Sequence, residues 1–529
     1  MWIMRFGYKQ ILRLFIVIVG FLHSSHAYHF LAVLHFSSKS HFIVGSALIK
    51  GLIDKGHEVT VISPFPQKKP IKNWHDVPVS GVLEFMQNET DDLLNTLERS
   101  VMENVVSFHK TGLQVTELVL KSPAVQKLMA SNQTFDAVIN EVFLSEALYG
   151  LSEHFKAPLI GLGTFGAISW NTDMVGSPSP PSYVPSTLLP FTDRMTLGQR
   201  IGNLALLTFE RLLLDLYYLP KQEKIFRQHF PHSQRSMLEI RKNAALVLLN
   251  SHVSLSFPRP YVPNQIEVGG MHINRQRKPL PLDIERFISE SPHGVVYFSM
   301  GSNIKSKNLP FEKRQELMKA LKSLKQRVLW KFEDPHLEGK PDNVYISDWF
   351  PQDDILAHDN VKVFITHGGL LSTTESIYHG KPFIGIPIFG DQFLNMAKAE
   401  ANGYGIMLDY KNLSANALKQ AVEKMVYNKE YTNLVKAMSA RYKDQPMAPL
   451  QKAVYWVEHV ARHKGAKYLH CAGLDLNFIQ YHNIDAILIL YGGILFVLFV
   501  VLWLLKCLLG CVFGNKSQSG KTAKKMKKQ

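Results

Sequence analysis

Residues 361–375 read VKVFITHGGLLSTTE. An apolar, β-branched run ends in His367-Gly368-Gly369, and the residues that follow have the polar start of a helix. A strand, a glycine turn and a helix form the βα unit of a parallel sheet, with backbone N–H groups at the positive end of the helix facing the turn. The glycines allow an anion to approach the backbone closely. The stretch therefore predicts an α/β fold with a phosphate-binding turn.

The same alternation continues through most of the chain. Short apolar runs are separated by longer segments with helical periodicity, such as residues 44–55 and 91–120. One series of runs comprises residues 30–34, 58–62, 137–139 and 159–162. A second comprises residues 246–249, 295–298, 328–332, 344–346, 361–366 and 383–386. Two series predict two doubly wound domains, and the carboxyl ends of their strands would face a common cleft.

The first 27 residues have the pattern of a cleaved secretory signal. Arg5, Lys9 and Arg13 precede or flank the apolar run 14–22, and Ser25-His26-Ala27 supplies small residues at the expected cleavage positions. The alternative is a buried first helix. We expect the mature chain to begin near Tyr28 and to enter the secretory pathway.

The other end has the pattern of a membrane anchor. Residues 486–505 carry no charge and are long enough to cross a bilayer, and the basic tail 506–529 places that end in the cytosol by the positive-inside rule. Lys525 and Lys527 form a dilysine pattern that resembles an endoplasmic-reticulum retrieval signal; a merely solvated basic tail is the alternative. Three glycosylation sequons begin at Asn88, Asn132 and Asn412.

Charge and cysteine content exclude several classes of protein. The chain of 529 residues has a formal net charge of +15, but leaving out the leader and the tail reduces this to 49 basic against 44 acidic residues. No basic field remains that favours nucleic acid. The three cysteines, Cys471, Cys507 and Cys511, are too few for a disulfide framework or a cysteine zinc site.

A longer motif surrounds the glycine turn. It begins at Trp349-Phe350-Pro351-Gln352, ends at Asp391-Gln392 and spans 44 residues. This pattern resembles the signature of the UDP-glycosyltransferases. Further elements match that family and, in part, its insect microsomal branch: residues 56–60, 182–185, 256–264, 298–302 and 462–467. The resemblance implies the two-domain fold called GT-B and transfer of a sugar from a UDP-sugar.

The resemblance implies a domain order that agrees with the periodicity. We expect a signal peptide (1–27), an acceptor-binding domain (28–268), a linker (269–282), a UDP-sugar-binding domain (283–445), helices that pack back toward the N-terminal domain and the membrane (446–485), a transmembrane helix (486–505) and a cytosolic tail (506–529).

The resemblance also implies roles for the donor-binding residues. The candidates are Ser302, Trp349, Gln352, His367, Gly369, Ser372, Glu375, Asp391 and Gln392. Trp349 would stack on uracil, Gln352 would bond uridine and Glu375 would accept from the ribose diol. Ser302, His367 and Ser372 would hold the diphosphate, and Asp391 with Gln392 would bind the sugar hydroxyls.

We expect no metal cofactor, because the chain has no Asp-x-Asp motif and the helix dipole with its nearby donors would meet the charge on UDP. Leu371 departs from the family pattern. Many relatives have Asn at this position, so one polar contact is missing.

The acceptor half must supply a general base. The family places it 16 residues before His57, which gives His41; His35 lies nearer the strand end but has the wrong spacing. An imidazole titrates near neutral pH and suits proton removal from a hydroxyl. The carboxylate that orients the base in relatives is often Asp, and the corresponding residue here is Glu141.

The donor sugar is predicted from one position. Relatives that transfer glucuronate use an Arg seven residues before Phe257, where this chain has Asn250. A neutral amide cannot neutralise a carboxylate, so we expect UDP-glucose and a small lipophilic acceptor, for detoxification or clearance. UDP-glucuronate is the first alternative and a non-catalytic sugar-nucleotide-binding partner subunit is the second. Homo- or hetero-oligomerisation is left open.

Overall fold

A computed structural model describes residues 27–90, 93–273 and 278–525. The predicted signal peptide, apart from its last residue, lies outside these ranges, and so do the centre of the predicted linker and the last four residues of the tail. The described residues up to His470 form one compact unit, and those from Cys471 onward form a second. Each unit is described separately below.

The first unit contains two parallel sheets, and the one formed early in the chain has the order β3-β2-β1-β4-β5-β6-β7 within the described residues. Its strands are β1 (His29–Val33), β2 (Glu58–Ser63), β3 (Trp74–Pro78), β4 (Ala137–Glu141), β5 (Leu159–Gly163), β6 (Leu246–Leu249) and β7 (Gln265–Glu267). The central strand β1 pairs in parallel with β2 on one side and β4 on the other. The strand order reverses between β1 and β4, so this is the point where a doubly wound sheet binds ligands.

The later sheet has the order β10-β9-β8-β11-β12-β13 in the part of the chain that is described. Its strands are β8 (Val295–Ser299), β9 (Arg327–Lys331), β10 (Val344–Ser347), β11 (Val361–Thr366), β12 (Phe383–Gly385) and β13 (Gly405–Met407). Here the order reverses between β8 and β11, the strand quoted at the outset. The prediction of two doubly wound domains is confirmed.

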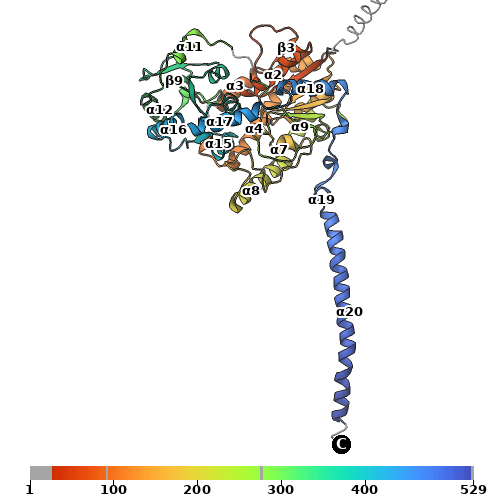
Figure 1. Ribbon diagram of the computed structural model, residues 1–529. Helices are drawn as coiled ribbons and strands as arrows, with labels where there is room; N and C mark the ends of the chain where they lie inside the picture. Colours follow the sequence, from red (N-terminus) through yellow and green to blue (C-terminus); the bar gives the residue numbers. More distant parts are fainter. Residues whose placement is uncertain (1–26, 91–92, 274–277, 526–529) are drawn as a thin grey trace, which may run out of the picture. The chain divides into compact units, whose positions relative to one another are not determined.

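Helices cover both sheets (Figure 1). Those of the first half are α2 (Lys39–Asp54), α3 (Gly81–Thr90), α4 (Val101–Lys121), α5 (Pro123–Met129), α6 (Gly150–His154), α7 (Ser169–Thr172), α8 (Leu197–Leu213), α9 (Leu219–His229) and α10 (Met237–Lys242). Those of the second half of this unit are α11 (Leu282–Ser289), α12 (Phe311–Lys322), α13 (Gln352–Leu356), α14 (Leu370–Tyr378), α15 (Gln392–Ala401), α16 (Ala415–Tyr427), α17 (Lys429–Lys443) and α18 (Pro449–Arg462).

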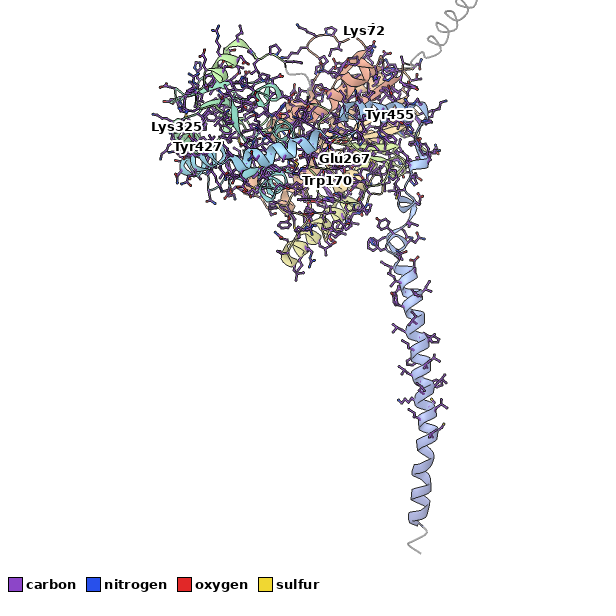
Figure 2. The ribbon with its side chains drawn as sticks, in the orientation of Figure 1. Lys72, Trp170, Glu267, Lys325, Tyr427 and Tyr455 are labelled. Carbon is purple, nitrogen blue, oxygen red and sulfur yellow. The ribbon has the colours of Figure 1, made fainter. Side chains whose placement is uncertain are left out.

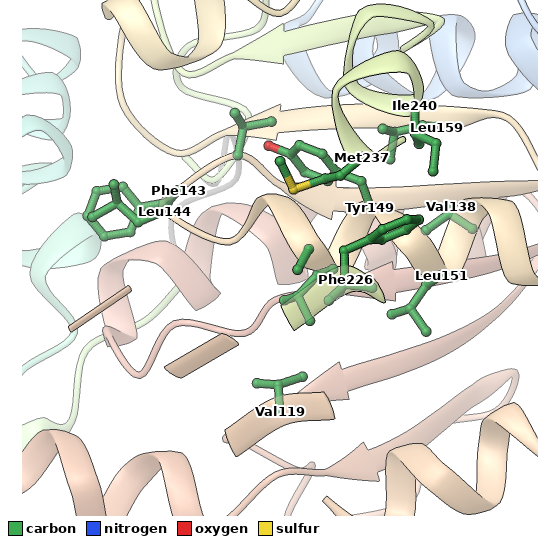
Figure 3. Packing of buried hydrophobic residues seen from close by; sticks show 14 of the residues in the cluster. Val119, Val138, Phe143, Leu144, Tyr149, Leu151, Leu159, Phe226, Met237 and Ile240 are labelled. Atoms are coloured by element: carbon green, nitrogen blue, oxygen red, sulfur yellow. The ribbon is translucent and has the colours of Figure 1, made fainter. Parts of the chain in front are cut away.

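The first sheet is buried on both faces. Figure 3 shows one face, where side chains of its strands, among them Val138 and Leu159, lie in one cluster with Tyr149 and Phe226. Side chains of β1 and β2 alternate between this cluster and a second one on the opposite face. A parallel sheet with both faces buried reads as continuous apolar runs, which is why these strands were visible in the sequence.

Helix α18 comes late in the chain but packs beside α2 of the first half (Figure 1). Val454 and Val457 belong to the second apolar cluster of the first sheet. A Cβ added at Gly51 on α2 would lie 2.8 Å from Leu450 Cδ1, so the two helices are in close contact. An ion pair of 3.0 Å between His57 Nε2 and Glu458 Oε1 adds a polar contact. The last helix of this unit therefore completes the core of the first sheet.

Three details differ from the sequence-based expectation. The run 246–249, expected in the second series, forms β6 of the first sheet and pairs with β5, because a short apolar run does not by itself show which sheet its strand joins. Strands β3, β7 and β13 were not expected, and all three lie at sheet edges, where a strand needs no continuous apolar run. The helix expected over 91–120 was placed too early: α4 begins at Val101, because Ser100 caps it through a capping box with Glu103.

The second unit contains α19 (Phe478–Tyr481) and the long helix α20 (Ile484–Lys525). Residues Ile484–Val512 are long and apolar enough to cross a membrane. The side chains of this stretch are not buried and project on both sides of the helix (Figure 2). The predicted C-terminal apolar helix is confirmed as a candidate membrane span.

Candidate active site

A cleft of about 430 Å³ lies between the carboxyl ends of the two sheets and is lined by residues from both. It brings together residues that are far apart in the sequence: His41, Ser302, Trp349, Gln352, His367, Gly369, Ser372, Glu375, Asp391 and Gln392. These are the predicted donor-binding residues and the predicted base. Glu141 lies directly behind His41 and completes the predicted set.

His41 lies in the first turn of α2, and its ring contacts the carboxylate that ends β4. The distance from His41 Nδ1 to Glu141 Oε1 is 2.5 Å. Burial alone raises the pKa of the Glu141 carboxyl, but the charges of His41 and His35 and the hydrogen bond with His41 outweigh burial and hold this pKa below its ordinary value. The ionised carboxylate can only accept, so it fixes the proton on Nδ1 and leaves Nε2 able to take a proton.

Two further side chains contact this pair. Thr164 Oγ1 lies 3.2 Å from both His41 Nδ1 and Glu141 Oε1. His35 Nδ1 lies 3.7 Å from Glu141 Oε2, while its Nε2 is 2.9 Å from the Phe143 carbonyl oxygen. His35 is buried, whereas the His41 side chain is 10% exposed and faces the cleft. The rival base is therefore a support for Glu141, and His41 is the imidazole that can meet an acceptor.

Aromatic rings surround the His41 imidazole. The ring centroids of Phe36, Phe143 and Phe165 lie 5.0 to 5.3 Å from that of His41. All three line the cleft, and Trp170 lies beside Phe143. The acceptor side of the cleft is thus apolar next to one polar ring.

On the opposite side, the strand-turn-helix of the opening sequence forms the predicted phosphate site. Gly369 is the N-cap of α14 and has no side chain to cap the helix, so the first N–H groups of α14 face the cleft. His367 packs between Gly301 and Gly369: an added Cβ would lie 2.5 Å from His367 Cε1 at the first and 2.5 Å from Nε2 at the second. Burial and the charge of Lys331 lower the pKa of His367 to about 4, so this imidazole is neutral near pH 7.

The predicted uridine side of the cleft has an exposed indole and a fixed polar group. Trp349 is 50% exposed, as a stacking platform must be. Gln352 Nε2 donates to Glu375 Oε2 at 2.6 Å and to Ser372 Oγ at 3.2 Å. The Tyr297 hydroxyl donates to Gln352 Oε1 at 3.2 Å and so sets the orientation of the amide.

Asp391 and Gln392 lie at the start of α15. Burial raises the pKa of Asp391, although Asn395 Nδ2 donates to its Oδ2 at 2.9 Å. Gln392 Oε1 accepts from the backbone N–H groups of Ile388 and Phe389 at 2.8 and 3.2 Å. Only the amide donor of Gln392 is therefore left to bond a sugar hydroxyl.

Asn250, the position used to predict the sugar, faces a smaller neighbouring cavity of about 90 Å³ that also includes Asp391. Its Nδ2 donates to the Thr164 carbonyl oxygen at 3.0 Å. Lys398 and Arg259 line the same cavity, and the Lys398 ammonium lies 4.8 Å from the Phe257 ring centroid. Burial lowers the pKa of Lys398 to about 8. The side chain at position 250 is neutral, but two cationic side chains, Lys398 and Arg259, line the cavity beside Asp391.

One cleft residue, Leu371, and one residue beside the cleft, Lys39, have contacts that the sequence did not indicate. Leu371, which replaces the Asn of many relatives, packs against the apolar cluster formed by the first sheet and α18. Lys39, from the start of α2, places its ammonium 5.1 Å from the Trp349 ring centroid. The position of Lys398 could have been inferred from the sequence, because it follows Asp391 by seven residues and this spacing places two residues on the same face of a helix. Both domains therefore contribute to the environment of the predicted donor-binding residues.

Comparison with known proteins finds relatives that match nearly the whole chain. The family model of UDP-glucoronosyl and UDP-glucosyl transferase matches residues 32–521. UDP-glycosyltransferase UGT5 of Dactylopius coccus is 38% identical over 97% of this chain and 99% of its own length. UDP-glucosyltransferase 2 of the same insect is 36% identical over 94% of this chain and 96% of its own. Human UDP-glucuronosyltransferase 2B15 is 31% identical over 92% of this chain and 94% of its own length.

Solved structures show the same fold. TcCGT1 in complex with UDP has a TM-score of 0.55 at 16% identity and covers 83% of this chain and 100% of its own. A UDP-glucosyltransferase from Polygonum tinctorium has a TM-score of 0.54 at 16% identity and covers 83% of this chain and 99% of its own. The two doubly wound domains thus have the GT-B arrangement. Since the family model matches nearly the whole chain, this protein belongs to the UDP-glycosyltransferase family.

Proposed function

We propose that this glycosyltransferase moves glucose from UDP-glucose to a hydroxyl of a small lipophilic acceptor, with inversion at the anomeric carbon. The observation that carries the proposal is the His41–Glu141 pair, which faces the predicted donor residues across one cleft. The aromatic rings around His41 support a lipophilic acceptor such as a phenol, a steroid-like alcohol or a plant compound.

In the proposed reaction, His41 Nε2 removes the proton of the acceptor hydroxyl. The acceptor oxygen bonds to the anomeric carbon as the bond from that carbon to the diphosphate oxygen breaks, and UDP leaves with the electron pair. Glu141 stabilises the imidazolium that forms. The N-terminus of α14, neutral His367 and the hydroxyls of Ser302 and Ser372 would meet the charge on UDP without a metal ion, so excess chelator should leave turnover unchanged.

The choice of glucose rests on the neutral amide at Asn250. The second candidate donor is UDP-glucuronate, which is favoured by Lys398 and Arg259 in the cavity beside Asp391. A protonated lysine there could neutralise a sugar carboxylate.

The test is turnover of the purified full-length enzyme with a panel of small phenols and alcohols and each donor in turn. We expect UDP release and glucoside formation with UDP-glucose, at least ten times faster than with UDP-glucuronate. Faster turnover with UDP-glucuronate than with UDP-glucose, together with loss of this preference in Lys398→Met, would instead favour UDP-glucuronate as the donor. UDP binding without turnover of any acceptor would instead indicate a non-catalytic partner subunit.

For localisation, we propose a single-span protein of the endoplasmic reticulum with its catalytic part in the lumen. Support comes from the apolar helix Ile484–Val512, the lysines that follow it and the exposed sequon residues Asn132 and Asn412. A shift in gel mobility after endoglycosidase treatment, lost when Asn88, Asn132 and Asn412 are all replaced by Gln, would support a lumenal catalytic part. Absence of a glycan on all of these sites in protein expressed in cells would contradict the lumenal location.

A further inference from the structure

One buried imidazole of the cleft has no place in the reaction described so far. His272 lies on the segment that joins the two sheets, and its side chain is 2% exposed. It lines the cleft together with Trp349, Gln352 and Glu375. Among the described residues, neither of its ring nitrogens has a hydrogen-bond partner. Buried polar atoms are nearly always bonded, so an unbonded imidazole aimed into a ligand cleft indicates a missing partner.

The backbone around His272 is held in place from both halves of the unit. The Tyr442 hydroxyl on α17 donates to the Gly269 carbonyl oxygen at 2.8 Å. Gly270 has a φ of +82°, and an added Cβ would overlap the Tyr442 hydroxyl. Met271 is buried in the apolar cluster of the first sheet. The backbone that carries the imidazole is thus held in place by both halves of the unit.

The carboxylate of Glu375 lies beside the imidazole. Its Oε2 accepts from Gln352 at 2.6 Å, while its Oε1 lies 3.4 Å from His272 Nε2. A carboxylate only accepts hydrogen bonds, whereas a ribose hydroxyl both donates and accepts. The imidazole can donate, so it offers the complement that Glu375 cannot give.

We propose that His272 is a further donor-recognition residue, which bonds one ribose hydroxyl of UDP together with Glu375 Oε1. The inference rests on the proposed donor site. It means that the linker, as well as the second domain, recognises the ribose.

The experiment measures binding of UDP, 2′-deoxy-UDP and 3′-deoxy-UDP to the full-length enzyme by calorimetry, without acceptor or turnover. We expect His272→Ala to weaken UDP about tenfold, the effect of one lost hydrogen bond. The same change should weaken one of the two deoxy analogues by no more than about twofold, because that analogue lacks the hydroxyl that His272 bonds. His272→Gln, which keeps a donor, should retain part of the discrimination.

The matched control is His358→Ala, which removes an imidazole 3.3 Å from Glu285 in the same domain but outside the cleft. It should leave all three affinities unchanged. Equal weakening of the three nucleotides by His272→Ala, or no weakening, would overturn the inference. If the His272→Ala variant does not fold, His272→Gln decides. Discrimination against both deoxy analogues equal to that of the wild type would then overturn the inference. Failure of the wild type to bind UDP would overturn the proposed function itself.

Discussion

Two histidines face the same cleft from opposite domains, and their surroundings give them opposite properties. His41 lies 2.5 Å from the buried Glu141 carboxylate, which can only accept and so fixes the ring proton on Nδ1. His367 is buried near the Lys331 ammonium, and its pKa is lowered to about 4. In the proposed reaction the first imidazole takes a proton at Nε2, whereas the second stays neutral and donates a hydrogen bond. The partner of a histidine therefore decides its chemistry, and a local sequence motif does not show that partner.

The largest expected effect comes from removing the base. His41→Ala should lower kcat by about 10³-fold, within the range of general-base contributions, because His35, the other imidazole beside Glu141, is buried. The Kd for UDP should stay the same, since the diphosphate is expected on the other domain. Steady-state kinetics with a phenol acceptor and calorimetry with UDP check both parts. A variant that glucosylates phenols as fast as the wild type would contradict the mechanism.

The next effect tests the carboxylate that distinguishes the two histidines. Glu141→Gln keeps the shape but loses the charge, so kcat should fall about 10²-fold. The pKa of Glu141 is held below its ordinary value, so the carboxylate is ionised near neutral pH and accepts from His41 Nδ1. Because Glu141 is expected to act through His41, Glu141→Gln should lower kcat little further in a His41→Ala background, as steady-state kinetics of the single and double variants would show. Additive losses in the double variant would show that Glu141 does not act through His41.

A smaller effect is expected from disturbing the neutral histidine. In Gly301→Ala the new Cβ meets the His367 ring, and the φ of +85° adds strain. The affinity for UDP should fall about tenfold, as measured by calorimetry. Gly339→Ala is the matched control, because its φ is +73° but nothing lies within 4 Å of the new Cβ. Equal effects of the two variants would mean that strain alone, and not the contact with His367, matters.

The smallest effect is expected at Leu371. Leu371→Asn restores the polar side chain of many relatives beside the predicted diphosphate site and should strengthen UDP binding about threefold, the effect of a weak neutral hydrogen bond. The same change removes an apolar contact with the first domain, so Tm should fall by a few degrees. Thermal unfolding and calorimetry measure the two consequences. Weaker UDP binding would show that the apolar contact supports the donor site.

The sequence predicted those parts of the fold that bury both faces of a strand. The runs around Leu31 and Phe364 are continuous and apolar, so their strands were found, whereas β3 contains His75 and Asp76 and lies at an edge. Periodicity alone predicts a helix over 91–120, but the capping box of Ser100 and Glu103 makes the helix begin at Val101. Local signals decide element ends, while periodicity decides only their existence.

For the site, the spacing of family motifs located His41 and the donor residues, and the structure brings them together in one cleft. Spacing could not locate His272, because its linker composition gave no functional pattern. It also gave Asn250 a role at the sugar without showing that Lys398 lines the same cavity. Side chains from distant segments meet only in three dimensions, so contacts of this kind are the part that sequence reasoning misses.

The return of α18 to the first sheet has a consequence for how the chain is made. Its first residue follows the end of β7 by 182 positions, yet its valines complete the apolar core that β1 and β2 begin. During synthesis, α2 can cover its part of this face of the early sheet, but the part that packs against α18 must stay uncovered while those residues are added, a delay on the order of 10 to 40 s. The nascent first domain therefore exposes an apolar surface to chaperones until its own distant helix emerges from the ribosome.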